Sequence, residues 1–189
     1  MKHEQLIELL METPIVAAVK NDEGLEKCLT CDAQVVFVLY GDVVNIGEKV
    51  ARIKEAGKAA FVHIDLIDGL AAREVAVDFI SKNTQADGII STKYPLVRYA
   101  KSLGLITIQR FFLLDSMALV NIQKQMTQDA ADLIEILPGV MPKIIHKLVS
   151  HARKPIIAGG LICDKEDVVS ALGAGATAIS STDPNVWFL

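Results

Sequence analysis

The stretch PIIAGGLICDKEDVVSALGAGATAISST, residues 155–182, indicates the fold of this chain. It opens with a short apolar run that stops at a pair of glycines. A segment with an acidic first turn and apolar residues at helical spacing follows, closes at two further glycines and leads into a second apolar run that ends in two serines. Two short apolar runs separated by an amphipathic helix are typical of a strand–helix–strand unit with parallel strands. The stretch therefore predicts one βαβ unit.

The glycine pair Gly159 and Gly160 and the serine pair Ser180 and Ser181 lie where these two predicted strands end. In a (β/α)₈ barrel, the loops after strands 7 and 8 often hold a phosphate through backbone N–H groups and a helix N-terminus. Glycines let the backbone approach an anion, and serine hydroxyls add donors. These four residues are therefore candidate phosphate ligands, and the alternative for the glycine pair is a tight turn.

The rest of the chain repeats this alternation of strand and helix. A short helix is predicted over 4–11, and further strands are predicted over 15–19, 34–40, 59–66, 87–92, 105–110 and 132–138. Helices are predicted between them over 22–30, 45–56, 73–82, 95–102, 115–127 and 142–152, and the tail leaves room for a vestigial last helix. Eight strands alternating with helices favour α/β architecture and a compact, TIM-like (β/α)₈ barrel, formed as a single domain over 1–189. No GxGxxG motif follows the first strand, which disfavours a dinucleotide-binding fold.

Polar residues interrupt three of the predicted strands at period two. They are His63 and Asp65, Thr107 and Gln109, and Glu135. Helices cover the outer face of a barrel strand, so that face should be apolar and these polar residues should point inward. Asp65, Gln109 and Glu135 are therefore candidate ligand contacts. His63 lies one layer deeper and is either a hydrogen-bonded core residue or a site residue.

Three cations also lie at predicted carboxyl ends of strands, where barrels place their ligand sites: Lys20, Lys93 and Arg110. Such a lining suits a small polyol phosphate, with Asp65 or Glu135 accepting hydrogen bonds from hydroxyls and the cations balancing the anionic groups. The alternative is that the three cations are solvated loop residues. A general acid–base enzyme using Lys20, Asp65 and Glu135 is also chemically feasible. No HExxH, histidine cluster or nucleophile elbow marks a metal centre or a serine hydrolase.

The composition disfavours several classes of protein. The chain is 51% hydrophobic, yet no run reaches the length of a membrane span, and the N-terminus lacks the pattern of a secretory signal. We therefore expect a cytoplasmic protein without a membrane partner. The formal net charge of −4 argues against nonspecific nucleic-acid binding. The three cysteines, Cys28, Cys31 and Cys163, form no even set suited to a disulfide framework.

Four stretches carry a resemblance to a known family: HIDLIDGL (63–70), DGIISTKYPLVRYAKSLGLITIQRFFLLDS (87–116), DLIEILPGVMPKII (132–145) and the stretch 155–182. Together they resemble the glycerol uptake operon antiterminator regulatory proteins, and the resemblance spans nearly the whole chain. It implies a TIM-barrel-like regulator rather than an enzyme, with glycerol 3-phosphate as its effector and no cofactor. In its liganded state such a regulator binds the leader mRNA of glycerol-utilisation operons and prevents termination of transcription.

An acidic chain that binds RNA needs a local basic patch or specific contacts to RNA shape and loops. The densest basic stretch supplies the candidates Lys143, Lys147, Arg153 and Lys154, and the alternative is an ordinary solvated helix face. Two other functions stay open on the residues alone: a small barrel enzyme acting on a triose or glycerol phosphate, and a metabolite sensor that binds protein. The sequence leaves the oligomeric state open, a homo-oligomer included.

Overall fold

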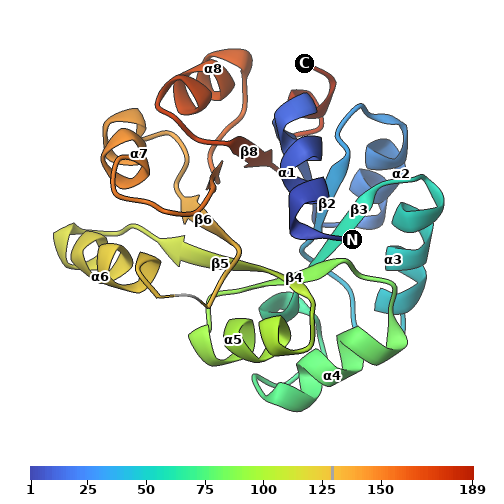
Figure 1. Cartoon of the computed structure of the whole chain (residues 1–189). Coiled ribbons are helices and arrows are strands. Elements are labelled where there is room, and N and C mark those ends of the chain that lie inside the picture. Colours follow the sequence, from blue (N-terminus) through green and yellow to red (C-terminus); the bar gives the residue numbers. More distant parts are fainter. Residues whose placement is uncertain (129) are drawn as a thin grey trace.

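The computed structural model describes residues 1–128 and 130–189, and over these residues eight parallel strands form a closed barrel in sequence order (Figure 1). The strands are β1 (Ile15–Val19), β2 (Val35–Val38), β3 (Ala59–His63), β4 (Gly88–Ser91), β5 (Ile106–Phe112), β6 (Leu133–Leu137), β7 (Ile156–Gly159) and β8 (Ala178–Ser181). The helices are α1 (His3–Glu12), α2 (Asp22–Thr30), α3 (Ile46–Glu55), α4 (Glu74–Asn83), α5 (Tyr94–Ser102), α6 (Ser116–Met126), α7 (Pro142–Val149) and α8 (Lys165–Gly173). The TIM-like barrel predicted from the sequence is confirmed.

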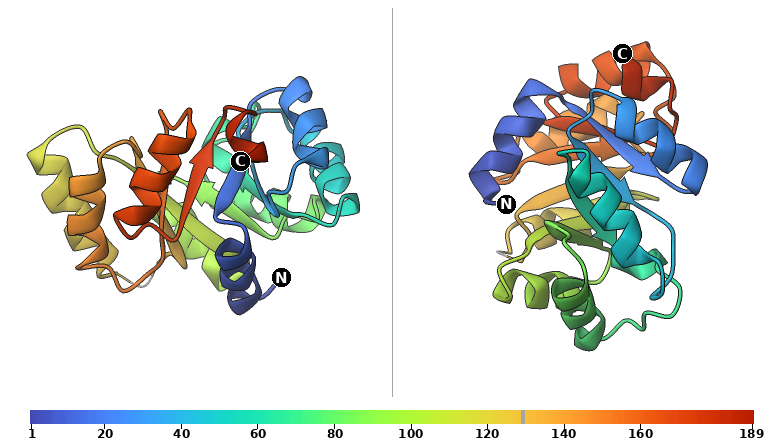
Figure 2. Two further views of the ribbon diagram at one scale, coloured as in Figure 1. Left: turned by 90° about the horizontal axis from the view of Figure 1, so that it is seen from above. Right: turned by 90° about the vertical axis from the view of Figure 1, so that its right-hand side faces the viewer.

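The half of the barrel interior nearer the start of the strands is apolar. Inward side chains such as Phe37, Phe61 and Ile108 pack there in one buried cluster. Helix α1 closes this end, because its Leu6 and Leu10 are fully buried in the same cluster. Figure 2 shows α1 at the end of the barrel where the strands begin. Polar groups that face the barrel axis are therefore confined to the opposite end, where the strands finish.

The chain after β8 forms only a short 3₁₀ helix, Val186–Phe188, which confirms the vestigial last helix. Trp187 lies in this turn, is 2% exposed, and donates a hydrogen bond from Nε1 to the carbonyl oxygen of Ser181 at 2.8 Å. This turn therefore packs against the barrel where an outer helix would otherwise lie. Within the described part of the chain, no helix is both long and apolar enough to span a membrane.

Two predicted strands differ from the structure in ways that matter for the site. Strand β3 ends at His63, and the next three residues form a 3₁₀ helix, Ile64–Leu66, so the prediction that Asp65 lies in a strand is wrong. Strand β5 runs two residues further than predicted, to Phe112, so Arg110 lies inside the strand rather than at its last position.

The predicted inward orientation of Thr107 and Gln109 is also wrong. Ile106 and Ile108 belong to the interior cluster, so Thr107 and Gln109, which alternate with them along the strand, face outward. The hydroxyl of Thr107 donates to the carboxylate of Asp132 at 2.9 Å, and the amide of Gln109 donates to Gln125 of α6 at 3.2 Å. The inward residues of β5 are apolar at this depth, and Thr107 and Gln109 find their partners on the outer side of the strand.

Candidate functional site

A cup of about 680 Å³ opens at the carboxyl ends of β1, β6, β7 and β8. This volume falls within the range of small-molecule sites. Its lining comes from the end of β1 and the start of α2, from β5 and β6, and from the loops after β7 and β8. Of the residues predicted as ligand contacts, the cup brings together Lys20, Arg110, Glu135, Gly160, Ser180 and Ser181.

A buried hydrogen-bonded network forms the floor of the cup. Arg110 and Glu135 are register partners in neighbouring strands, and Nε of Arg110 donates to Oε2 of Glu135 at 2.6 Å. The hydroxyl of Ser180 donates to the other carboxylate oxygen, also at 2.6 Å. Arg110 is 7% exposed and Glu135 is 0% exposed. Both oxygens of Glu135 are thus engaged, so the carboxylate orients Arg110 and Ser180 at the floor of the cup.

Arg110 is the member of this network that can meet a ligand. Within the described part of the chain, Nε is the one guanidinium nitrogen of Arg110 that has a hydrogen-bond partner. The side chain also lines the cup. A guanidinium carries five N–H donors in a planar fork, which suits phosphate and carboxylate oxygens. Four of these donors remain for an anion or for hydroxyl groups at the floor of the cup.

Gly159 lies directly against the network. A Cβ at this position would lie 2.4 Å from the Ser180 hydroxyl and 2.7 Å from Oε1 of Glu135. The glycine predicted as a phosphate ligand therefore provides space for the buried carboxylate. Gly160 follows with a φ of 77°, and its carbonyl accepts a hydrogen bond from the Gly139 amide at 2.9 Å.

Leu161, the next residue, has a φ of 63° and is 73% exposed. Positive φ in a branched, non-glycine residue is uncommon and costs free energy, and such residues cluster at functional sites. The loop after β7 thus carries backbone strain at the mouth of the cup.

Ser181 holds the rim together. Its hydroxyl donates to the carbonyl of Ile162 at 2.7 Å and accepts from the amide of Asp183 at 3.0 Å. It therefore connects the loop after β7 to the loop after β8. The hydroxyl proton is used within the protein, which disfavours the predicted role of Ser181 as a phosphate donor.

Asp65 and Lys93 lie together but away from the cup. The carboxylate of Asp65 accepts hydrogen bonds from the Ser91 hydroxyl at 2.8 Å and the Thr92 amide at 2.7 Å, and Nζ of Lys93 lies 3.8 Å from it. Partial burial opposes its ionisation, but these hydrogen bonds hold the pKa of Asp65 below its ordinary value. Asp65 thus anchors the start of the loop after β4. Neither it nor Lys93 lines the cup.

His63 points into the barrel from the end of β3 and is 3% exposed. Its Nδ1 is buried and has no hydrogen-bond partner among the described residues. Burial, with the nearby positive charge of Arg110, lowers the pKa of His63 to about 4, although Asp65 acts in the opposite direction. The imidazole is therefore neutral at pH 7, and its predicted position one layer below the cup is confirmed.

The low pKa of His63 predicts a pH dependence of stability. The unfolded state, with an ordinary histidine pKa near 6.5, takes up the proton before the folded state does. The stability is therefore complete above about pH 6.5 and falls as the pH decreases toward 4. By pH 5 we expect the wild type to have lost about 2 kcal/mol of unfolding free energy through this residue.

Urea unfolding at pH 7.5 and pH 5 measures this loss, with His63→Gln as the comparison. Carboxylates contribute to the acid sensitivity of both proteins. The loss of unfolding free energy between pH 7.5 and pH 5 should therefore be larger in the wild type than in His63→Gln, and the difference is due to His63. An equal loss in the two proteins would contradict the prediction.

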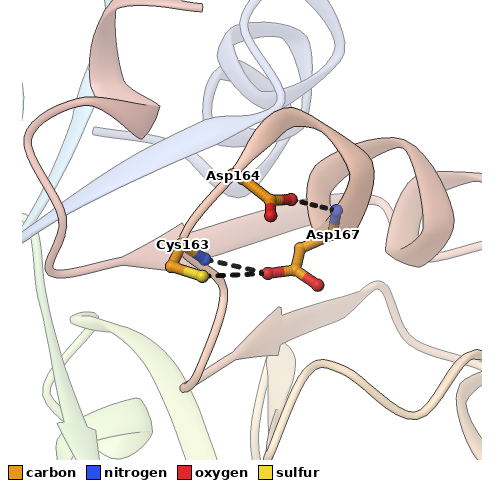
Figure 3. Close-up of side chains that lie close together, drawn as sticks. All are labelled: Cys163, Asp164 and Asp167. Atoms are coloured by element: carbon orange, nitrogen blue, oxygen red, sulfur yellow. Dashed lines mark hydrogen bonds between the residues drawn. The ribbon is translucent and has the colours of Figure 1, made fainter.

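Cys163, Asp164 and Asp167 gather at the start of α8, as Figure 3 shows. The Asp164 carboxylate accepts from the Asp167 amide at 2.9 Å, and the Asp167 carboxylate accepts from the Cys163 amide at 3.0 Å. These are the contacts of a helix N-cap. The hydrogen bond to Asp167 also raises the pKa of the Cys163 thiol, which disfavours a reactive thiolate. Capping accounts for this cluster.

The C-x-x-C pair is structural. Cys28 and Cys31 are both buried, and the Cys31 thiol contacts the Cys28 carbonyl at 3.2 Å. Burial raises the pKa of Cys28 to about 12, so the thiol stays protonated.

The four predicted RNA contacts do not behave alike. Lys143 and Lys147 of α7 and Arg153 in the following loop are exposed, and none forms an ion pair within the described residues. Lys154 is half-buried, and its ammonium donates to the carbonyls of Gln128, at 3.0 Å, and Ala131. Lys154 therefore fastens the loop before β6.

The first and last segments contribute cup residues that were not predicted, in addition to the predicted Lys20, Ser180 and Ser181. Asn21 and Lys27 of the β1–α2 segment line it, as do Asp183 and Trp187 after β8. Strands β1 and β8 are neighbours in a closed barrel, so their following segments meet at one mouth. In an eight-stranded barrel the first and last strands must be adjacent, and this adjacency is the signal from which these cup residues could have been predicted.

The chain is similar to a known protein family over most of its length. Residues 15–187 match the family model described as glycerol-3-phosphate responsive antiterminator. The chain is 44% identical over 184 residues to the uncharacterized protein YgcP of Escherichia coli (strain K12), covering 97% of this chain and 96% of that protein.

Two solved structures are similar over nearly their whole length. One is the glycerol uptake operon antiterminator regulatory protein of Listeria monocytogenes, with a TM-score of 0.88, 32% identity, and coverage of 93% of this chain and 95% of that one. The other is a glycerol uptake operon antiterminator-related protein of Thermotoga maritima, with a TM-score of 0.81, 32% identity, and coverage of 92% and 96%. The chain therefore belongs to the family of glycerol-3-phosphate responsive antiterminators, which are regulatory proteins.

Proposed function

We propose that this protein binds glycerol 3-phosphate in the cup and, in that state, binds the leader mRNA of glycerol-utilisation operons and prevents termination. Its family supports the effector, and the family's regulatory role supports a protein that works without turnover or cofactor. The observation that carries the proposal is the oriented guanidinium of Arg110 on the floor of a cup of suitable volume. A role in transcription places its action in the cytoplasm.

The ligand uses two regions of the cup. Glycerol 3-phosphate has an anionic end and a polyol end, and each needs different partners. The phosphate lies at the loops after β7 and β8 near Gly160, with Lys20 at the rim. The hydroxyl groups then reach the floor, where Arg110 supplies donors and the Ser180 oxygen can still accept.

The RNA binds through the basic face of α7 and the loop that follows it. Lys143, Lys147 and Arg153 are exposed cations, and 142–155 contains no acidic residue. Contacts from such cations to phosphates provide affinity that falls as salt rises. The whole chain has a net charge of −4, so favourable electrostatics with RNA must come from a local basic surface such as this one.

Ligand and RNA are linked through the loops at the mouth of the cup. Ordering the loops after β5 to β8 around the ligand favours the conformation that binds RNA. The ligand shifts this equilibrium only by the difference in its affinity for the two conformations.

The single tryptophan of the chain gives a direct test, because Trp187 lines the cup. Titration with glycerol 3-phosphate is expected to change its emission saturably, and glycerol alone should bind at least about tenfold more weakly because it lacks the charged group. Arg110→Lys keeps the charge but loses the fork, so it should weaken binding. Unchanged affinity in Arg110→Lys would contradict the proposed place of the ligand.

A gel shift with leader RNA, with and without glycerol 3-phosphate, tests the proposed RNA binding. We expect ligand-dependent binding that is weakened in Lys143→Ala/Lys147→Ala, with Lys82→Ala, an exposed lysine of α4, as the matched control. Ligand binding without an RNA shift would favour a sensor that binds protein. Turnover of glycerol 3-phosphate would favour a small barrel enzyme.

A further inference from the structure

The end of β5, the loop after it and α6 expose an unusual amount of apolar surface. Phe112 is 52% exposed, Leu114 85%, Met117 71% and Val120 48%. We call these four residues the α6 patch. Single apolar residues are common on protein surfaces, but a group of this kind marks an interaction site. Figure 1 shows α6 at the periphery of the molecule, flanked by α5 and α7.

Helix α6 has a second apolar face that is already used. Ile122 and Met126 are buried against Phe111 and Ile134 of the barrel. On the opposite side, Met117 and Val120 continue into the exposed residues Asn121 and Lys124 at helical spacing. The packing of α6 on the barrel therefore does not require the exposed stripe, which is available to a partner.

The charges of this segment indicate what kind of partner fits. Residues 112–126 contain two charged residues, Asp115 at the N-cap of α6 and Lys124 in its last turn. Neither forms an ion pair with another residue of the described part of the chain. RNA would require several cations on this surface. A second copy of the chain fits better, because antiparallel pairing of two α6 helices places Asp115 of each copy opposite Lys124 of the other.

We propose that the α6 patch is the interface of a homodimer in which the α6 helices of two copies pack antiparallel about a two-fold axis near Val120. Such an interface is isologous and must be self-complementary, which a neutral segment with one charge of each sign at its ends satisfies. Each copy carries a net charge of −4, so association needs a surface that adds no like charge.

This inference does not depend on ligand or RNA binding, but it has a consequence for both. Helix α7 is the neighbour of α6 (Figure 1), and Leu148 of α7 and Ile122 of α6 belong to the same buried cluster. A dimer around α6 therefore carries two copies of α7, each with Lys143 and Lys147 exposed. It doubles the basic surface proposed for RNA.

Sedimentation velocity of the full-length protein over a range of concentrations tests the dimer. The wild type is expected to be a dimer, and Met117→Asp/Val120→Asp is expected to raise the dissociation constant at least about 30-fold. The matched control is Val75→Asp/Val169→Asp, because these valines of α4 and α8 are also exposed, at 65% and 60%. Circular dichroism checks that both double variants are folded.

Cross-linking then tests the geometry. In a Cys163→Ser background, which removes the exposed thiol, Val120→Cys should form a disulfide-linked dimer under mild oxidation, and Val75→Cys should not. A wild type that is monomeric at all concentrations would overturn the proposal and leave the patch to a different protein. A dimer that survives Met117→Asp/Val120→Asp, or that is not cross-linked through Val120→Cys, would overturn it as well.

Discussion

Replacing Glu135 with alanine is expected to lower the free energy of unfolding by about 3–5 kcal/mol. The carboxylate is fully buried and accepts hydrogen bonds from Arg110 and Ser180, each at 2.6 Å. Its removal leaves the guanidinium of Arg110, which is 7% exposed, without its ionic partner. An uncompensated buried charge is among the costliest single changes in a protein.

The matched control removes both charges together. Glu135→Leu/Arg110→Met keeps the volume of the pair, so it should recover most of the stability lost in Glu135→Ala. Urea unfolding at pH 7.5 measures the two effects. The double variant should nevertheless fail to bind glycerol 3-phosphate, as measured by Trp187 emission, because the donors of Arg110 are gone. A double variant no more stable than Glu135→Ala would contradict the assignment of the loss to the unpaired charge of Arg110.

Gly159→Ala is expected to lower the free energy of unfolding by about 1–3 kcal/mol, as overpacking of a buried site does. The added methyl group would lie 2.4 Å from the Ser180 hydroxyl and 2.7 Å from the Glu135 carboxylate. The hydroxyl can rotate away only by giving up its hydrogen bond to Glu135. The substitution therefore disturbs the same network that orients Arg110, and we expect weaker binding of glycerol 3-phosphate as well.

Gly173→Ala is the matched control, because it makes the same chemical change in open space. Gly173 is the last residue of α8, and a Cβ there meets no atom of the described residues within 4 Å. Alanine should stabilise the protein there by up to about 1 kcal/mol. Thermal or urea unfolding of both variants measures the contrast. A Gly159→Ala protein as stable as Gly173→Ala would contradict the close packing around Glu135.

The hydrophobic periodicity of the sequence predicted the barrel. This periodicity is a local property, because it relates residues that are only a few positions apart. Apolar runs of strand length separated by amphipathic helices recur along the chain, and local burial alone produces that pattern. The same reasoning placed Glu135 correctly, because the apolar Ile134 and Ile136 on either side of it face the outer helices.

Strand β5 shows where this reasoning fails. An alternating strand has two faces, and alternation does not say which face points inward. Polar residues were predicted to face the interior in both β5 and β6. The inward residues of β5 are apolar at Ile106 and Ile108, and its inward polar residue is Arg110, next to Glu135 of β6. The prediction that Asp65 lies in a strand failed for a different reason, because β3 ends two residues before it and the chain continues as a 3₁₀ helix.

The sequence by itself thus determined the fold class, the end of the barrel that carries the polar groups and the loops that form the mouth of the cup. Only the tertiary structure decided which polar groups meet. Arg110 and Glu135 are 25 residues apart and meet through the register of the neighbouring strands β5 and β6. Ser180 and Glu135 are 45 residues apart on β8 and β6, and they meet across Gly159 of β7, which has no side chain, in the register of these three strands. Local residue preferences carry no record of that register, because it is set by the packing of the whole interior.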